Sequence, residues 1–369
     1  MKVKQSWPTI DMEEYIAIKE CFDVGWFTEG EKSKKFEDKI KKMLGVKYGI
    51  LTPSGTTALY VGLKSIGIGI GDEVIVPDYT FHASAAVVIM AEAKPIFVDV
   101  EKENFQIDID ICEKIVKQRK IKAIMPVHMH GICCNMDRVM DFAKKHNILV
   151  IEDACQAIGT NWKGKMAGSF GDVGCLSFFA DKCLTTVEGG FVATDNKKIY
   201  NKLQYLKNHG RLVKSTFVHP ELGYNFCLND ILASIGLVQL KKFDSMVKRR
   251  IYLNNLYKEC LKDVNQVKIL EPIEGSNHVP FKTVLLCESE SQDLMNYLVV
   301  NDIESRTMFY PMHKQPCFQY LKDVQDLSDD KFENAIYAFK HGINLPCYPD
   351  LSDEQVIYVA KIIKEYYNL

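Results

Sequence analysis

The sequence predicts an α/β protein with a mostly parallel central sheet flanked by helices, followed by a small C-terminal α+β domain. From residue 48 onward, short continuous apolar runs alternate with segments of helical periodicity. This alternation is typical of parallel strands that are buried on both faces. Further along the chain the order changes to mixed helices and strands. We therefore expect a large domain at residues 1–245 and a small domain at residues 246–369, with the boundary near Phe243–Arg250.

The N-terminal part is expected to hold a helix opened by Asp11 and a second, amphipathic helix at Ser33–Leu44. The expected strands of the large domain are Tyr48–Leu51, Glu73–Pro77, Pro95–Val100, Lys122–Val127, Leu149–Ile151, Cys175–Phe179 and Phe191–Thr194. The expected helices are Thr57–Ile66, Ala83–Ala91, Ile109–Gln118, Met136–His146 and a long one at Asn229–Met246. In the small domain we expect strands at Val267–Leu270 and Thr283–Cys287, and helices at Asp293–Asn301 and Asp353–Tyr367.

Composition and charge narrow the class of protein. The 369 residues are 47% apolar and 25% charged, with a formal net charge of −2, so no electrostatic argument favours nucleic acid or a membrane surface. Residues Met1–Ile10 lack the apolar core of a signal peptide, and no apolar run approaches the roughly 18 residues of a membrane span. The twelve cysteines include no Cys-x-x-Cys pair, which indicates reduced thiols in a cytoplasmic protein. A zinc site is the less favoured alternative, and we expect no metal.

Lys182 lies in a polar loop between two apolar runs that look like buried strands. A solvated loop lysine is the ordinary interpretation. A lysine between buried strands is costly to desolvate unless it is paired or neutral, and one way to be neutral is a Schiff base with pyridoxal phosphate (PLP).

Polar residues also follow two other expected strands, where ligands of parallel sheets bind. After the first strand, Gly55 and the hydroxyls beside it precede a helix, which suits either a phosphate or a simple helix cap. After the fifth strand, Asp153 needs a cationic or hydrogen-bonding partner. A protonated pyridine nitrogen is such a partner, and a helix-capping role is the alternative.

Together these motifs resemble the DegT/DnrJ/EryC1/StrS family of PLP-dependent aminotransferases, which act on nucleotide-linked keto-sugars. The pattern Ser-Phe-x-x-x-Lys-x-x-Thr-x-x-Glu-Gly-Gly runs from residue 177 to residue 190, Ser-Gly-Thr ends at residue 56, and Glu-Asp-x-x-Gln ends at residue 156. The similarity extends from about Gly25 to about Tyr366, with the motifs in the family order. It implies the PLP-dependent transferase fold type I, which is the fold of aspartate aminotransferase.

The resemblance also implies roles for residues around the cofactor. Lys182 would form the Schiff base and, once released, move the proton to and from the substrate carbon. Asp153 would hold the pyridine nitrogen, and Gln156 would lie close to the 3-hydroxyl group. The ring of Phe81 would stack on the pyridine.

The resemblance also implies which residues contact the cofactor phosphate and which contact the substrate. Gly55, Thr56 and Ser177 would bind the cofactor phosphate, and Asn225 would reach the phosphate of the neighbouring subunit in a homodimer. The residues expected to contact the substrate are Trp26, Phe27, Tyr310 and His313.

The implied reaction moves an amino group from L-glutamate, through pyridoxamine phosphate, to the ketone of an NDP-4-keto-6-deoxyhexose. The resemblance is strongest to the C-4 aminotransferases that make perosamine or viosamine. Three alternatives stay open: a C-3 aminotransferase, a PLP-dependent sugar dehydratase, in which histidine replaces the lysine, and a catalytically idle PLP-binding regulator of the same fold.

Two positions depart from the family pattern. Cys227 stands where the family has an arginine, which puts in doubt any substrate or donor contact of that arginine. Val187 stands where the family has a glycine. Because valine is costly at a positive φ, we expect the local turn to differ from that of the family.

Overall fold

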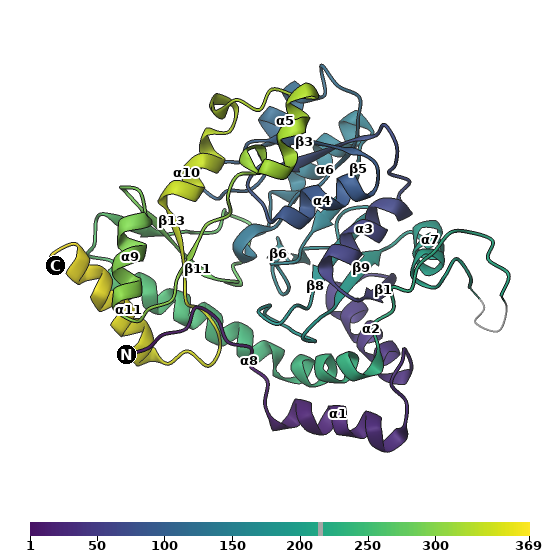
Figure 1. The fold of residues 1–369 in the computed structure, drawn as a ribbon, viewed down its shortest axis with the longest axis horizontal. Coiled ribbons are helices and arrows are strands. Elements are labelled where there is room, and N and C mark those ends of the chain that lie inside the picture. Colours follow the sequence, from purple (N-terminus) through teal and green to yellow (C-terminus); the bar gives the residue numbers. More distant parts are fainter. Residues whose placement is uncertain (213–216) are drawn as a thin grey trace.

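The central element is a seven-stranded sheet with the strand order β1-β9-β8-β5-β4-β2-β3. A computed structural model describes residues 1–212 and 217–369 of the chain (Figure 1). Strand β9 is antiparallel to both of its neighbours, and all other pairs in the sheet are parallel. The predicted α/β class with a mostly parallel sheet is therefore confirmed. The strands of this sheet are β1 (Tyr48–Thr52), β2 (Glu73–Pro77), β3 (Lys94–Val98), β4 (Ile121–Ile124), β5 (Leu149–Asp153), β8 (Val173–Ser177) and β9 (Gly190–Thr194).

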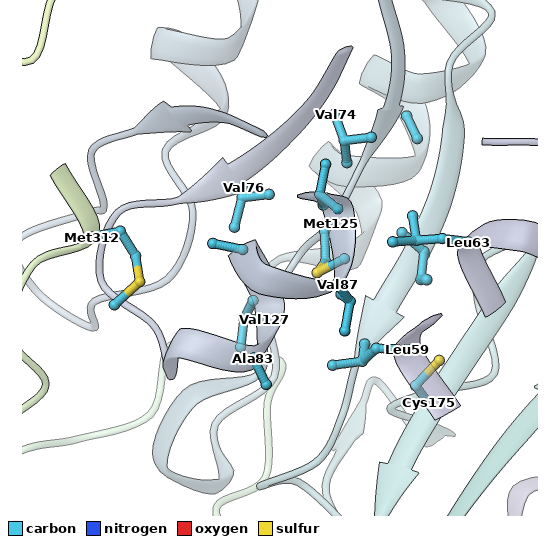
Figure 2. Close-up of a cluster of buried hydrophobic side chains, with 14 of the residues drawn as sticks. Leu59, Leu63, Val74, Val76, Ala83, Val87, Met125, Val127, Cys175 and Met312 are labelled. Carbon is cyan, nitrogen blue, oxygen red and sulfur yellow. The ribbon is translucent and has the colours of Figure 1, made fainter. Parts of the chain in front are cut away.

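Helices cover both faces of the sheet, because alternate residues of each strand point to opposite sides. Val74 and Val76 of β2 belong to one buried cluster, whereas Ile75 between them belongs to another. Figure 2 shows the first cluster, in which Leu59 and Leu63 lie close to side chains of the sheet. The helices are α1 (Met12–Val24), α2 (Glu31–Leu44), α3 (Gly55–Ser65), α4 (His82–Met90), α5 (Ile109–Ile115), α6 (Met136–His146), α7 (Lys197–Lys207), α8 (Asp230–Leu261), α9 (Gln292–Val300), α10 (Glu333–His341) and α11 (Asp353–Tyr366).

The C-terminal part is built on a second, antiparallel sheet with the order β10-β11-β13-β12. Its strands are β10 (Val267–Ile269), β11 (Thr283–Cys287), β12 (Arg306–Thr307) and β13 (Gly342–Leu345). Helix α11 packs against both α8 and α9, and a third buried cluster fills the space between these elements. Short elements complete the described chain: the hairpin strands β6 (Asn161–Trp162) and β7 (Lys165–Met166), and the 3-10 helices η1 (Met129–Gly131), η2 (Met312–Lys314), η3 (Pro316–Asp323) and η4 (Asp329–Lys331).

The long helix α8 joins the two parts and extends well beyond the predicted end at Met246 (Figure 1). Its backbone continues unbroken through the expected boundary at Phe243–Arg250. At its start, the Asp230 carboxylate accepts hydrogen bonds from the backbone N–H groups of Gly30 (2.8 Å), Lys32 (3.1 Å) and Ser33 (2.8 Å). Helix α8 therefore anchors the beginning of α2 at one end and packs on the C-terminal sheet at the other.

The first residues of the chain pack on the C-terminal part rather than on the large sheet. Val3 is fully buried in the third cluster and forms a parallel bridge with Ile303. Both chain termini accordingly lie on the same side of the molecule (Figure 1). Helix α1 follows with an Asp11–Glu14 capping box, as the polar opening at Asp11 predicts, and it packs along α8.

Val187 adopts a left-handed conformation with φ 71°, so the turn does not avoid the positive φ that is costly for valine. The turn before β9 is tied by hydrogen bonds: the Val187 N–H donates to Thr185 Oγ1 at 2.8 Å, and Thr186 Oγ1 donates to the Glu188 carbonyl at 2.7 Å. The surrounding hydrogen bonds thus hold a β-branched residue where glycine would be unstrained.

We expect Val187→Gly to raise the free energy of unfolding by about 1 kcal/mol, because it removes left-handed strain that exceeds the entropic cost of glycine. Urea denaturation measures the change. Val187→Ala is the matched control and should gain less, since alanine still carries a Cβ atom. A Val187→Gly protein that is no more stable than wild type would contradict the presence of strain at this position.

Candidate active site

The carboxyl ends of β1, β2, β5 and β8 meet around a cavity of about 370 Å³. The loop after each strand supplies part of its wall, which is the expected ligand position in a parallel sheet. The lining residues are Ser54, Gly55, Thr56, Leu59, Thr80, Phe81, Ala83, Val127, Met129, Asp153, Cys155, Gln156, Ser177, Phe179, Asp181, Lys182, Glu188, Phe281 and Phe309.

One end of the cavity is a cradle for an anion at the start of α3. Ser54 caps the helix by accepting the Thr57 N–H at 3.1 Å, and the first N–H groups of α3 have no partner within the helix. Gly55 packs so tightly that a Cβ atom there would lie 2.7 Å from Ser177 Cβ. The glycine therefore lets the helix start approach the Ser177 hydroxyl. The predicted N-cap is confirmed, and phosphate binding at this turn stays a prediction.

Asp153 ends β5 as a buried carboxylate with a defined orientation. Its Oδ2 accepts a hydrogen bond from the Ser84 hydroxyl at 2.8 Å, and its Oδ1 accepts the Cys155 N–H at 3.1 Å. Ser84 in turn lies 2.8 Å from the Thr80 hydroxyl, one helical turn earlier. Both donors are neutral, and no cationic side chain among the described residues pairs with the Asp153 carboxylate. This carboxylate can therefore hold a cationic group of a ligand.

Gln156 presents a donor to the same cavity. Its Oε1 accepts the backbone N–H of His130 at 3.1 Å, which orients the side chain. No acceptor in the described part of the chain lies within hydrogen-bonding distance of its NH2 group, so that group can donate to a ligand oxygen.

Lys182 reaches the cavity from the loop between β8 and β9. Its Nζ lies 3.6 Å from Asp181 Oδ1 and 4.2 Å from the centre of the Phe281 ring. The side chain is only 14% exposed. An amine that lines the same cavity as a buried carboxylate and the start of a helix matches a cofactor that carries an aldehyde, a basic ring nitrogen and a phosphate.

The cavity also contains a thiol that is not activated. Cys155 lines the wall, and burial, followed by the negative charge of Asp153, raises the pKa of its thiol well above the ordinary value. A protonated thiol is a poor nucleophile, so Cys155 is not an activated nucleophile in this cavity.

The structure brings seven of the predicted residues to the cavity wall: Gly55, Thr56, Phe81, Asp153, Gln156, Ser177 and Lys182. The others lie elsewhere. Trp26 and Phe27 are exposed in the connection between α1 and α2, and Asn225 is exposed where it bridges to Asn208. Tyr310 lines a second, adjoining cavity.

His313 is buried and lines neither cavity. Its Nδ1 lies 2.6 Å from Asp78 Oδ2, and its ring stacks on Phe332 at 4.3 Å. Burial raises the pKa of the Asp78 carboxyl, while the hydrogen bond from His313 opposes this shift. His313 therefore connects the loop after β2, through Asp78, to the segment that carries Met312, and it does not line the cavity.

Sequence reasoning missed three contributors to the site. Ser84 orients Asp153, and the available signal was a second hydroxyl, Thr80, four residues earlier in the loop between β2 and α4. Phe281 and Phe309 come from the C-terminal part and close the cavity over Lys182 and Phe81. Their distance along the chain from the other wall residues left no local signal.

The described residues contain no metal-binding cluster, no disulfide and no membrane-spanning helix. Across residues 1–212 and 217–369, no group of three or more His, Cys, Asp or Glu side chains is arranged to hold a metal ion. All twelve cysteines lie among the described residues, and none of them forms a disulfide. No helix in the described part combines the length and the apolar character that crossing a membrane requires.

We expect Gly55→Ala to weaken PLP binding at least about tenfold and to cost about 1–3 kcal/mol of stability, because the new methyl group would overlap Ser177 Cβ at a buried strand end. Equilibrium titration with PLP and thermal unfolding measure the two effects. Gly69→Ala is the control, since a Cβ there would meet only the flexible end of Lys64 at 3.8 Å. Equal PLP affinity in the Gly55→Ala and wild-type proteins would contradict the close approach.

The fold and the cavity define a PLP-dependent aminotransferase of fold type I. The model of the DegT/DnrJ/EryC1/StrS aminotransferase family matches residues 8–364, and the chain belongs to this family. It is 36% identical over 365 residues to the GDP-perosamine synthase of Escherichia coli O157:H7, covering 98% of this chain and 97% of that protein. It is 31% identical over 369 residues to the UDP-N-acetyl-3-dehydro-alpha-D-glucosamine 3-aminotransferase of Acidithiobacillus ferrooxidans, covering 97% of each.

A solved structure agrees with these relatives. The PLP form of a putative sugar aminotransferase from Streptococcus pneumoniae superposes with a TM-score of 0.93 at 27% identity, covering 100% of this chain and 99% of that chain. The protein is thus a PLP-dependent sugar aminotransferase, and the predicted class and cofactor are confirmed.

Proposed function

We propose that the protein transfers an amino group from L-glutamate to C-4 of an NDP-4-keto-6-deoxyhexose, giving an amino-sugar nucleotide for glycan synthesis. The observation that carries this proposal is the placement of Lys182 and Asp153 on the wall of one cavity, beside the anion cradle at Gly55. The likeness to the GDP-perosamine synthase supports C-4 as the position.

The cofactor, when bound, supplies an aldehyde and an electron-accepting ring. In this proposal, residues of the cavity wall bind and orient it. Lys182 holds the aldehyde carbon and moves a proton to and from the substrate carbon. Asp153 keeps a proton on the ring nitrogen, and Ser84 fixes the direction of its carboxylate. Lys182 and Asp153 thus control the two protons on which the transfer depends.

Three further groups position the cofactor. Ser177, with the N–H groups at Gly55 and Thr56, binds the phosphate. Phe81 holds the ring plane from one side, and the NH2 group of Gln156 donates to the ring oxygen. These contacts keep the reacting carbon within reach of Lys182.

Incubation of the purified protein with PLP, L-glutamate and a panel of GDP-, UDP- and dTDP-linked 4-keto-6-deoxysugars tests the proposal. We expect equal amounts of 2-oxoglutarate and of a 4-amino sugar, identified by NMR. No product from any member of the panel would reject the proposal. A deoxy-sugar formed without an amine would instead establish the dehydratase alternative.

Amination at C-3 is the second candidate, and the likeness to the 3-aminotransferase of Acidithiobacillus ferrooxidans favours it. The same assay with 3-keto sugar nucleotides separates the two candidates. Turnover confined to the 3-keto substrates, with nitrogen on C-3 in the product, would replace C-4 by C-3.

We also propose that the enzyme acts as a cytoplasmic homodimer with its sites at the subunit interface. Phe81 and Phe179 line the cavity yet are 55% and 45% exposed in the single chain, which supports a second copy covering the opening. Twelve cysteines without a disulfide among them support a reducing compartment.

Two measurements test the dimer. Sedimentation equilibrium gives the mass in solution, where a monomer would reject the proposal. If Asn225 acts in the neighbouring site, mixing inactive Lys182→Ala and Asn225→Ala proteins should restore activity, because mixed dimers contain one intact site. Absence of restored activity in mixed dimers of proven composition would reject that role of Asn225.

A further inference from the structure

A second cavity, of about 550 Å³, adjoins the first and shares its aromatic wall. Phe281 and Phe309 line both cavities, as do Gln156 and Asp181. The other walls come from the N-terminal segment, including Gln5, and from the C-terminal sheet. A group bound there would share the Phe281 ring with the first cavity, where the Lys182 Nζ atom lies 4.2 Å from the centre of that ring.

Lys282 is a buried lysine on this wall without an anionic partner. It is 6% exposed, and its Nζ has one hydrogen-bond acceptor, the neutral amide oxygen Gln5 Oε1 at 3.4 Å. Its Nζ is also 5.0 Å from the centre of the Phe281 ring. In the described part of the chain, no carboxylate lies within ion-pair distance of it. Because a buried ammonium group is costly unless it is paired, an anionic group bound beside Lys282 would be stabilised.

The neighbouring cations add to this excess of positive charge. Arg250 of α8 is 3% exposed and donates from Nη1 only to carbonyl groups, those of Phe281 (3.0 Å) and Cys347 (2.8 Å) among them. Arg306 of β12 lines the cavity from its exposed side. Asp181 is the carboxylate of this wall, and it already lies beside Lys182.

Asn344 lines the same cavity and carries a buried acceptor without a partner among the described residues. Asn344 is 7% exposed, and its Nδ2 donates to the Thr307 carbonyl at 3.0 Å. Its Oδ1 is buried and has no hydrogen-bond partner among the described residues. A ligand that carries both an anionic group and an N–H or O–H donor would satisfy Lys282 and Asn344 together.

We propose that Lys282 and Arg306 form a subsite that binds an anionic group of a substrate, with Asn344 accepting a hydrogen bond from the same substrate. The inference rests on the proposed function, in which two substrates carry such groups. They are the amino donor, with its carboxylates, and the sugar nucleotide, with its diphosphate. Both also carry N–H or O–H donors, so binding measurements must distinguish them.

Isothermal titration of the PLP-loaded protein with glutarate and, separately, with inorganic pyrophosphate tests the subsite without turnover. We expect Lys282→Met to weaken binding of one probe at least about tenfold, which is the effect of losing one charge-assisted hydrogen bond. The affected probe identifies the source of the anion. Arg306→Met should weaken the same probe less, because Arg306 is exposed, and Lys282→Arg should retain most of the affinity.

Lys268→Met is the matched control, since Lys268 is exposed on the neighbouring strand β10 and its loss changes the net charge equally. Its affinities should stay within twofold of wild type. The proposal is overturned if wild type binds neither probe, or if Lys282→Met binds both as wild type does. An equal loss in Lys268→Met would also overturn it. Because binding is measured directly, a failure of amino transfer in the panel assay would leave this result intact.

A pH series gives an independent readout. Burial is the largest cause that lowers the pKa of Lys282, and Arg250 and Lys182 add to it, while Asp181 and Cys347 oppose it; together they bring the pKa to about 8. Since the ammonium form binds an anion, the affinity of wild type should fall as the pH rises from 7 to 9.5, and that of Lys282→Arg should not. Lys282→Met should also unfold at the same or a higher temperature, because it removes a desolvated charge. Parallel pH profiles in the two proteins would exclude Lys282 as the titrating group.

Discussion

Lys182→Ala is expected to lower the turnover number by at least about 10⁴-fold, the largest effect of any single substitution in this protein. The variant loses both the amine that holds the cofactor aldehyde and the group that moves the proton at the substrate carbon. Product NMR measures turnover. Mass spectrometry after borohydride reduction measures covalent attachment, and wild type should gain the mass of one cofactor where Lys182→Ala gains none.

Two controls separate this chemistry from a loss of structure. Lys198→Ala removes an exposed lysine just after β9 and should behave as wild type. The Lys182→Ala protein should keep its thermal midpoint, since Nζ makes no hydrogen bond with the described residues. Partial rescue of turnover by added methylamine would support the proton-moving role. Residual activity within tenfold of wild type would show that another group carries the reaction.

Asp153→Asn is expected to lower turnover by about 10²–10³-fold, the scale found when one preorganised electrostatic contact in an active site is lost. Asparagine keeps the shape of the side chain and removes its charge. The proton on the cofactor ring nitrogen is then no longer stabilised, and the ring accepts electrons less well. Steady-state kinetics should place the loss in kcat, with a smaller change in KM for L-glutamate.

The supporting hydrogen bond offers a graded comparison. Ser84→Ala removes one of the two donors to Asp153 and leaves the Cys155 N–H in place, so we expect a loss of no more than about tenfold. Asp244→Asn removes the charge of an exposed carboxylate on α8 and should have no effect on turnover. If Asp153→Asn retained full activity, the charge of Asp153 would have no part in the reaction.

Local patterns were sufficient to predict much of the fold. Strands β2 and β11 and helix α6 have the predicted bounds, because each is a strongly periodic or apolar run between turn residues. Helix α8 was predicted to end at Met246, where a charged run begins. It continues because Leu253, Tyr257 and Leu261 pack in the core of the C-terminal part, a tertiary contact that a helical pattern does not reveal.

Two short strands of the C-terminal sheet, β12 and β13, were not predicted. Strand β13 has four residues and carries the polar Asn344, so its sequence lacks a clear strand pattern. Strand β12 has two residues, both exposed, and is defined by its pairing with β13. Such elements are determined by their neighbours in the sheet rather than by their own sequence.

The residues of the active site also fall into two groups, those that local sequence patterns predict and those whose positions depend on contacts distant in sequence. Gly55, Asp153, Ser177 and Lys182 were predictable because parallel strands end at one edge, which places their following loops around one cavity. His313 was predicted from a motif to face the substrate, but its packing is determined by Asp78 and Phe332, which are distant in sequence. The roles of Trp26, Phe27 and Asn225 stay predictions, because they depend on a second subunit or on a bound substrate.

Helix α8 also limits how the chain can change in evolution. Asp230 holds the start of α2, and Arg250, twenty residues later and about 30 Å along the axis, holds the carbonyl of Phe281. Inserting or deleting one residue between them would turn one end by about 100° relative to the other. Either the start of α2 would then lose its hydrogen bonds to Asp230, or the Phe281 carbonyl would lose its hydrogen bond from Arg250. Length variation among homologues should therefore be rare between these two positions and common in the surface loops.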